Sequence, residues 1–227
     1  MNTIYELFLC TTLLILVFLP CYQADPDPLQ DFCVADPTSG ITVNGFACKA
    51  ARAARSSDFF SSAISKGGST DNPNGSNATV MDATVFPGLN TLGVSMNRVD
   101  FEEGGINPPH VHPRASEVGY VAEGILYVGI LSTENKLYSK ILKAGESFVM
   151  PRGLLHFQYN MGPGKATQFV SFNSQKPGIV FAPQTLFGSK PEIPTEILAK
   201  AFRVDTDTIE YIKSKFQDDC SSGVEAA

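Results

Sequence analysis

The chain has 227 residues, with 17 Lys and Arg against 23 Asp and Glu, and a formal net charge of −6 at pH 7. Its length allows one large domain or two small ones, and its 43% apolar and 18% charged residues can bury a core. The acidic balance argues against nucleic-acid binding, which usually needs a basic face, and against an anionic membrane surface. Only three histidines are present, so their positions matter.

A short apolar run lies near the start of the chain. Residues 7–19 read LFLCTTLLILVFL, which is shorter than the roughly 20 apolar residues that a membrane-spanning helix needs. The run is typical of a secretory signal peptide, although residues 1–6 contain no Lys or Arg. We expect residues 1–24 to be removed, with cleavage between Cys21 and Ala24, and the protein to be secreted and free of the membrane. An uncleaved membrane anchor is the alternative, which the short run disfavours.

Three cysteines remain after this cleavage, namely Cys33, Cys48 and Cys220. In an oxidising compartment two of them should pair, and Cys33 and Cys48 are the closest in sequence. A bridge between them would stabilise the fold by about 3 kcal/mol by restricting the unfolded chain. Cys220 lies in a polar tail and would be a free thiol or an intermolecular link.

Two consecutive sequons occupy the loop NPNGSNAT, at Asn74-Gly-Ser and Asn77-Ala-Thr. A single N-x-S/T is a weak signal, but two of them in a Gly- and Asn-rich loop behind a signal peptide favour exposed, modifiable backbone. We therefore expect N-glycosylation at Asn74 or Asn77, or at both.

The middle of the chain has the sequence pattern of a β-protein. Short apolar runs separated by turn residues predict strands at 79–86, 90–101, 116–122, 125–131, 137–142, 147–151, 154–160 and 166–173. Strands that recur at such short intervals indicate a sandwich or a barrel, here over about 79–180.

The flanking segments have other patterns. Residues 50–64 could form a short helix or irregular turns. Residues 194–217 have helical spacing, with Asp207 at N-cap distance before Glu210, and a polar tail follows at 218–227. No linker is long enough to separate a second domain, so the sequence predicts one all-β domain with a C-terminal helical extension.

All three histidines lie within the predicted barrel, and a glutamate accompanies them. His110 and His112 are two residues apart, which on a strand places both side chains on one face. A Pro-Arg pair then interrupts the strand, so Glu117 can turn to the same face, and His156 lies on a later strand. Three imidazoles and one carboxylate suit a divalent transition metal, and Zn²⁺, Fe²⁺ and Cu²⁺ are all compatible with this set. A single histidine is more often a hydrogen-bonded core or loop residue, but this combination favours a metal site.

Two segments around these residues match a known pattern. Residues 104–124, GGINPPHVHPRASEVGYVAEG, fit G-x5-H-x-H-x4-E-x6-G, the first cupin motif in its germin form. Residues 145–160, GESFVMPRGLLHFQYN, fit the second motif, G-x5-P-x-G-x2-H-x3-N. Further similarity includes DPDPLQDFCVAD, NTLGVSMNRVDF, NKLYSK, VSFNSQ and PGIVF. Over nearly the whole mature chain, the sequence resembles the plant germins and germin-like proteins of the cupin superfamily.

This resemblance implies a cupin jelly-roll β-barrel, with a single germin-type domain over residues 25–227. It also implies a secreted, glycosylated protein of the extracellular space, the plant apoplast, assembled as a homo-hexamer, a trimer of dimers. The metal would be Mn²⁺, held by His110, His112, Glu117 and His156. The family disulfide would join Cys33 to Cys48.

The resemblance also implies a choice of functions. A manganese site open to small anions would take oxalate or superoxide, and some germins oxidise oxalate to CO₂ and H₂O₂. In those germins, pocket asparagines are thought to hold the acid, and Asn97 and Asn107 match them, although either can instead serve the barrel wall. Many relatives keep the metal ligands without this activity. The protein would therefore be an oxalate oxidase, a superoxide dismutase, or a non-catalytic manganese-binding wall scaffold or receptor, with a role in defence or cell-wall redox chemistry.

Overall fold

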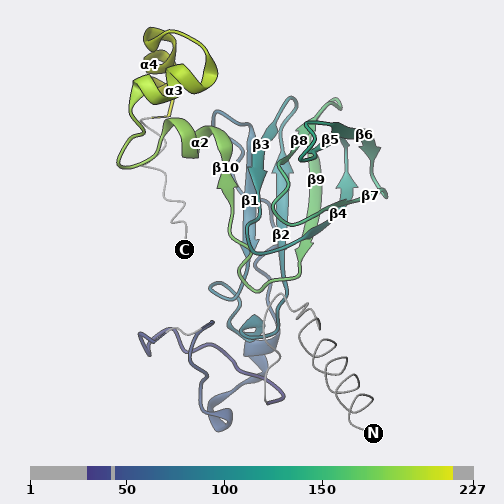
Figure 1. Cartoon of the computed structure of the whole chain (residues 1–227). Coiled ribbons are helices and arrows are strands. Elements are labelled where there is room, and N and C mark those ends of the chain that lie inside the picture. The colour runs from purple at the N-terminus through teal and green to yellow at the C-terminus, as the bar shows by residue number, and fades with distance from the viewer. Residues whose placement is uncertain (1–29, 42–43, 217–227) are drawn as a thin grey trace, which may run out of the picture.

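The structure is a computed structural model that describes residues 30–41 and 44–216. The predicted signal peptide, Cys220 and the rest of the polar tail lie outside these residues. Two five-stranded antiparallel sheets face each other as the walls of a barrel (Figure 1), so the prediction of an all-β domain is confirmed. No helix in the described part of the chain is long and apolar enough to span a membrane.

One sheet has the strand order β1-β2-β9-β4-β7, and the facing sheet has the order β10-β3-β8-β5-β6. The strand bounds are as follows: β1 (Ser76–Met81), β2 (Ser95–Phe101), β3 (Ile106–Val111), β4 (Glu117–Glu123), β5 (Ile125–Leu131), β6 (Leu137–Lys143), β7 (Ser147–Met150), β8 (His156–Asn160), β9 (Ala166–Phe172) and β10 (Val180–Phe181).

The core lies between the two sheets because alternate side chains point inward. On β4, Glu117, Gly119 and Val121 are buried, whereas Val118 and Tyr120 are exposed. The same alternation on the other strands gathers one apolar cluster, which contains Val99, Phe101, Ala115, Val121, Leu126, Val128, Leu142, Met150, Ala166, Val170 and Phe172. Polar residues at inward positions are therefore surrounded by protein on most sides.

The helices lie outside this barrel. The 3₁₀ turns are η1 (Ala51–Ala53), η2 (Ser56–Phe59) and η3 (Pro87–Leu89), and the α-helices are α2 (Ala182–Phe187), α3 (Thr195–Phe202) and α4 (Thr206–Ser214). Figure 1 shows α3 and α4 projecting from the barrel, to which α2 and β10 connect them. They have a small core of their own, made of Leu198, Ala199 and Ile209 with Phe187 and Ile193 against it.

A buried lysine ties the two C-terminal helices to the segment before them. Lys213 on α4 is only 3% exposed, and its ammonium donates to Glu192 Oε2 at 3.1 Å, to the Ile193 carbonyl at 2.7 Å and to Thr195 Oγ1 at 3.1 Å. All three of its donors are satisfied, which is the condition for burying such a group without a large desolvation penalty.

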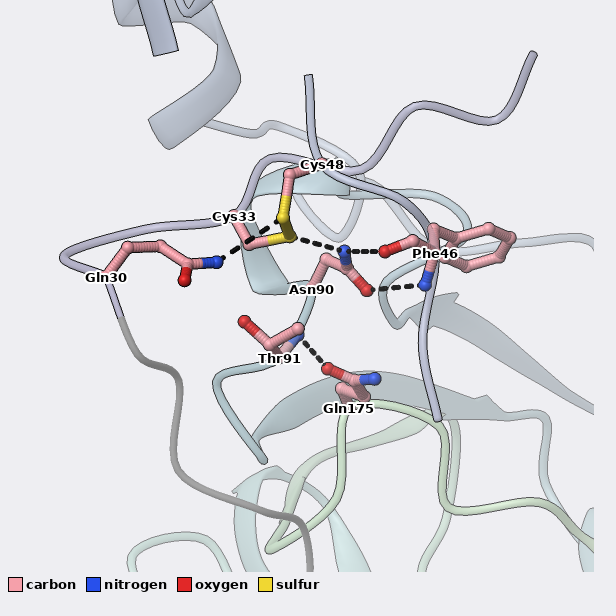
Figure 2. Close-up of a disulfide and its surroundings, with 7 residues drawn as sticks. All are labelled: Gln30, Cys33, Phe46, Cys48, Asn90, Thr91 and Gln175. Atoms are coloured by element: carbon pink, nitrogen blue, oxygen red, sulfur yellow. Dashed lines mark hydrogen bonds between the residues drawn. A yellow bond between two sulfur atoms is a disulfide. The ribbon is translucent and has the colours of Figure 1, made fainter. Parts of the chain in front are cut away.

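A disulfide closes the N-terminal segment on itself, and a buried amide ties this segment to the loop before β2. Cys33 and Cys48 are bonded, as the germin resemblance implied. Figure 2 shows Asn90 beside the bridge: its Nδ2 donates to the Phe46 carbonyl at 2.9 Å and to Cys33 Sγ at 3.3 Å, and its Oδ1 accepts from the Phe46 N–H at 3.0 Å. Asn90 is fully buried, so this exchange replaces the hydrogen bonds that its amide would make with water.

The predicted strands 79–86 and 90–101 are wrong over residues 82–86 and 90–94, because residues 82–94 form turns instead. The carboxylate of Asp82 accepts from Thr84 N–H at 2.8 Å, and its carbonyl accepts from Phe86 N–H at 2.8 Å. Pro87, which lacks an N–H, then opens η3. A side chain that hydrogen-bonds two residues ahead competes with strand pairing. The apolar residues of this stretch instead favoured the prediction of a strand.

Strand β3 was absent from the predicted list of strands because it contains two consecutive prolines. Its pairing with β8 is irregular between Asn107 and His110, and prolines are tolerated at such irregularities. The two-residue β10 and the helix α2 were not predicted either.

Two smaller corrections concern helices. Residues 50–64 contain the 3₁₀ turns η1 and η2, which agrees with irregular turns rather than an α-helix. The N-cap of α4 is Asp205, not Asp207, since Asp205 has extended backbone angles and its Oδ1 accepts from Thr208 N–H at 2.7 Å. Asp207 lies in the first turn.

We predict that Gly124→Ala destabilises the barrel. Gly124 joins β4 to β5 at a φ of +81°, and an added Cβ would lie 2.5 Å from Ala166 Cβ and 2.8 Å from Ala166 Cα. Backbone strain and overpacking should together lower the free energy of unfolding by about 2–4 kcal/mol, measured by urea denaturation. Gly164→Ala is the matched control, because Gly164 has a φ of +80° with no atom within 4 Å of the added Cβ. Equal losses in the two variants would contradict the packing argument.

Candidate metal centre

The four predicted ligand residues come from both sheets and meet at one end of the barrel interior. His110 on β3 and His156, the first residue of β8, are register partners in one sheet. Glu117 is the first residue of β4 in the facing sheet, and His112 lies in the turn that connects β3 to β4. One potential ligand atom from each residue lies within 4.8 Å of all the others. None of the four side chains belongs to a residue more than 4% exposed.

The same type of hydrogen bond orients all three imidazoles. Nδ1 of His110 lies 2.8 Å from the Pro108 carbonyl, and Nδ1 of His156 lies 2.8 Å from the Leu154 carbonyl. Nδ1 of His112 lies 2.6 Å from the carbonyl of Gly178. A carbonyl oxygen can only accept, so each Nδ1 must carry the proton and donate. In the neutral ring, Nε2 then presents a lone pair, which is the form that binds a metal.

The carboxylate of Glu117 lies unusually close to these Nε2 atoms. Its Oε2 is 3.1 Å from Nε2 of His112 and 3.4 Å from Nε2 of His156. Nε2 of His156 is also fully buried, with no hydrogen-bond partner among the described residues. Lone pairs that converge in a dry interior without a proton between them repel one another, and a cation placed among them would relieve this repulsion. The residues present therefore fit a bound metal ion.

Burial and mutual interactions set the charge of the site. Burial, with smaller effects from His156 and His112, lowers the pKa of His110 to about 3, so this ring is neutral at pH 7. Burial alone would raise the pKa of Glu117, but the close imidazoles of His112 and His156 outweigh it and lower this pKa to about 2. An ionised glutamate beside a neutral imidazole has the ligand charges that a divalent cation requires.

The donor set narrows the class of metal without choosing one ion. Ca²⁺ and Mg²⁺ prefer oxygen donors, whereas three imidazole nitrogens and one carboxylate oxygen suit first-row transition metals. Two aromatic rings pack against ligand imidazoles: the Phe172 ring centroid is 4.6 Å from that of His112, and the Phe181 centroid is 5.4 Å from that of His110.

A second group of polar side chains lies deeper in the barrel, next to the ligands along the strands. Asn107 is buried, and its Nδ2 donates to Oε1 of Gln158 at 2.8 Å. Gln158 follows His156 by two residues on β8, so both point into the barrel. Sequence reasoning overlooked Gln158, although its spacing from His156 could have revealed it. Asn97 on β2 is half-buried, and its Oδ1 accepts from the N–H of Met81 at 3.2 Å; both predicted asparagines thus also bond within the protein.

The two sequons lie far along the chain from these ligands, at the start of β1. Asn74 is in the turn before the strand, and Asn77 is its second residue; both are half-buried. The amide of Asn77 packs on Gly68, where an added Cβ would lie 2.1 Å from Asn77 Oδ1. Glycosylation at either position stays a prediction.

We predict that Glu117→Gln weakens metal binding strongly, because it keeps the shape of the side chain but removes the compensating charge. The loss should exceed the roughly 10–100-fold that follows removal of an outer-shell partner, measured by titration calorimetry with Mn²⁺. Glu146→Gln is the control, since Glu146 is bonded to Lys140 at the surface. A Glu117→Gln protein with unchanged affinity, or a His110→Ala/His156→Ala protein that still holds full metal, would overturn the assignment.

Comparisons with known proteins agree with this geometry. Residues 62–210 match the Cupin family model. A putative germin-like protein 3-4 of Oryza sativa subsp. japonica is 63% identical over 196 residues, which cover 85% of this chain and 86% of the relative. Oxalate oxidase 1 of Hordeum vulgare is 58% identical over 197 residues, covering 85% and 98%. A solved structure of oxalate oxidase in complex with the substrate analogue glycolate superimposes with a TM-score of 0.84 at 58% identity, covering 85% of this chain and 98% of that one. The chain therefore belongs to the cupin family, among the germins and germin-like proteins.

Proposed function

We propose that this chain is a secreted, manganese-binding germin-like protein of the plant apoplast that oxidises oxalate: oxalate + O₂ + 2 H⁺ → 2 CO₂ + H₂O₂. The observation that carries the proposal is the buried set of three Nε2-presenting histidines and one ionised glutamate, in a chain 58% identical to a barley oxalate oxidase. The peroxide would serve cell-wall redox chemistry or defence.

The choice of manganese comes from the germin resemblance, since the donor set alone also suits other transition metals. When bound, the metal would supply Lewis acidity and one-electron redox chemistry. With one carboxylate and neutral imidazoles as ligands, a divalent ion leaves the site with a formal charge of +1. A positive site in a largely apolar interior attracts a small anion such as oxalate.

The residues of the chain itself would bind and orient the acid. Nε2 of Gln158 is buried and has no hydrogen-bond partner among the described residues, while Oε1 is held by Asn107. This N–H is therefore available to an incoming carboxylate oxygen, and Asn107 fixes the amide in the required orientation. Asn97, on the facing sheet, is proposed to contribute a second polar contact. The rings of Phe172 and Phe181 limit the access of water to the ligands.

The proposal is tested with purified, Mn²⁺-loaded protein assayed for H₂O₂ release from oxalate and for removal of superoxide, with metal content measured on the same sample. We expect near-stoichiometric manganese and peroxide release that depends on oxalate. Removal of superoxide without oxalate oxidation would favour a superoxide dismutase instead. Full manganese with neither activity would leave a non-catalytic wall scaffold or receptor.

We predict that Gln158→Met lowers kcat/KM for oxalate by about 10–100-fold, because the variant keeps the side-chain volume but removes the N–H donor to a charged group. Manganese content should be unchanged. Tyr159→Phe is the control, since Tyr159 is the next residue on β8 and is 37% exposed. Unchanged kcat/KM in Gln158→Met would contradict the role of this amide.

We also propose a homo-oligomer, with a hexamer built as a trimer of dimers. The projecting helices α3 and α4 expose Ile197, Phe202 and Tyr211 at 55%, 48% and 65%, which is a large apolar surface for so small a unit. On the outer face of the barrel, Val118 on β4 and Val149 on β7 are 57% and 56% exposed and directly paired. Multi-angle light scattering of the mature protein should give six times the chain mass, and a strict monomer would contradict the proposal.

A further inference from the structure

The three histidines of the metal centre differ in what orients them. His110 and His156 each bond a carbonyl only two residues earlier in the chain, at Pro108 and Leu154. The acceptor for His112 is Gly178, which is 66 residues away. The local strand geometry therefore orients the first two rings. The orientation of His112 depends instead on where a separate segment, residues 176–178, lies across the barrel end.

Arg114 holds that segment with two hydrogen bonds and one packing contact. Its Nε donates to the Lys176 carbonyl at 2.7 Å, and its backbone N–H donates to the Pro177 carbonyl at 3.2 Å. Its guanidinium lies directly over Gly178, where an added Cβ would be 2.8 Å from Nη2 and 2.9 Å from Cζ. Three successive carbonyls are thus engaged, the first two by Arg114 and the third by His112.

Gly178 is required at this place for two reasons. Its φ is +65°, which L side chains rarely adopt, and the guanidinium occupies the space that a side chain would need. The unusual backbone angle turns the carbonyl of Gly178 toward His112 while its Cα faces Arg114. Because Arg114 is itself exposed, replacing it would leave no cavity in the core.

We propose that Arg114 is a positioning residue for the metal centre, which acts through the carbonyl of Gly178 on the orientation and tautomer of His112. This inference rests on the proposed metal site. Without the Arg114 side chain, residues 176–178 lose the hydrogen bond from Nε to the Lys176 carbonyl and the packing contact on Gly178, while the backbone N–H of residue 114 still donates to the Pro177 carbonyl. Nδ1–H of His112 then has a less constant acceptor, and its Nε2 points less consistently at the ion.

The first test uses Mn²⁺ alone as the probe. Arg114→Ala should lower Mn²⁺ affinity by about tenfold, the lower end of the range for outer-shell partners, and broaden the electron paramagnetic resonance spectrum of the bound ion. Arg114→Lys should recover only part of the affinity, because an ammonium cannot reproduce the planar guanidinium. The control is Arg152→Ala, an exposed arginine one residue before Gly153, which should bind as the wild type does. Wild-type affinity in Arg114→Ala would overturn the proposal.

A second readout needs no metal and no activity. In metal-free protein with ¹⁵N-labelled histidine, Arg114→Ala should speed solvent exchange of the Nδ1 proton of His112 and spare those of His110 and His156. Equal acceleration at all three rings would indicate general loosening and overturn the specific role. If the wild type binds no Mn²⁺, the proposed function fails, yet this measurement still decides whether Arg114 orients His112.

A double-mutant cycle tests whether the two residues act together. Gly178→Ala should weaken Mn²⁺ binding partly because its Cβ collides with the guanidinium. In the Arg114→Ala background this collision is gone, so Gly178→Ala should cost less affinity there than in the wild type. Strictly multiplicative losses would show that Arg114 and Gly178 act independently and would contradict the proposed route.

Discussion

Glu117 carries a negative charge into the interior of the barrel, where it is 2% exposed, and the rest of the site is organised around this charge. Removing a carboxylate from water is costly unless other groups compensate for it. Here the nearest groups are imidazoles whose Nδ1 protons are already donated to carbonyls, so their inner nitrogens offer lone pairs rather than protons. The glutamate and the histidines thus require the same partner, a cation.

The barrel can supply this arrangement because its ligands lie where strands begin or end. Glu117 and His156 are first residues of strands, and His112 lies just beyond the end of β3. At these places a side chain has the fixed direction of a strand, yet the neighbouring turn can bring in a group from elsewhere in the chain. Gly178 reaches His112 in this way. The interior positions of the same strands are then free for the apolar core and for the Asn107–Gln158 pair.

The metal ligands could be predicted from the sequence because their placement follows local rules. The H-x-H spacing predicts that both side chains share one face of a strand, and this direction holds for His112 although it lies just beyond the end of β3. The turn that follows allows Glu117 to join them. The path of residues 176–178 and the fully buried Asn90 could not be predicted in this way. Both depend on contacts between residues many positions apart, which no local pattern indicates, and Asn90 was predicted to begin a strand. Strand β3 was hidden by its two prolines, and Asp205 rather than Asp207 caps α4 because backbone angles decide between two nearby aspartates.

The origin of the ligands in both sheets has a mechanical consequence. At the ligand end of the barrel, β3 and β8 belong to one sheet and β4 to the other, and the two walls are joined there by packing and by the short turn from β3 to β4. An ion bound by all four residues would cross-link the two sheets. Since it would bind the folded chain and not the unfolded one, its binding energy would add to the stability of the fold. The thermal unfolding temperature of a protein sample would then depend on the fraction of its molecules that hold the metal.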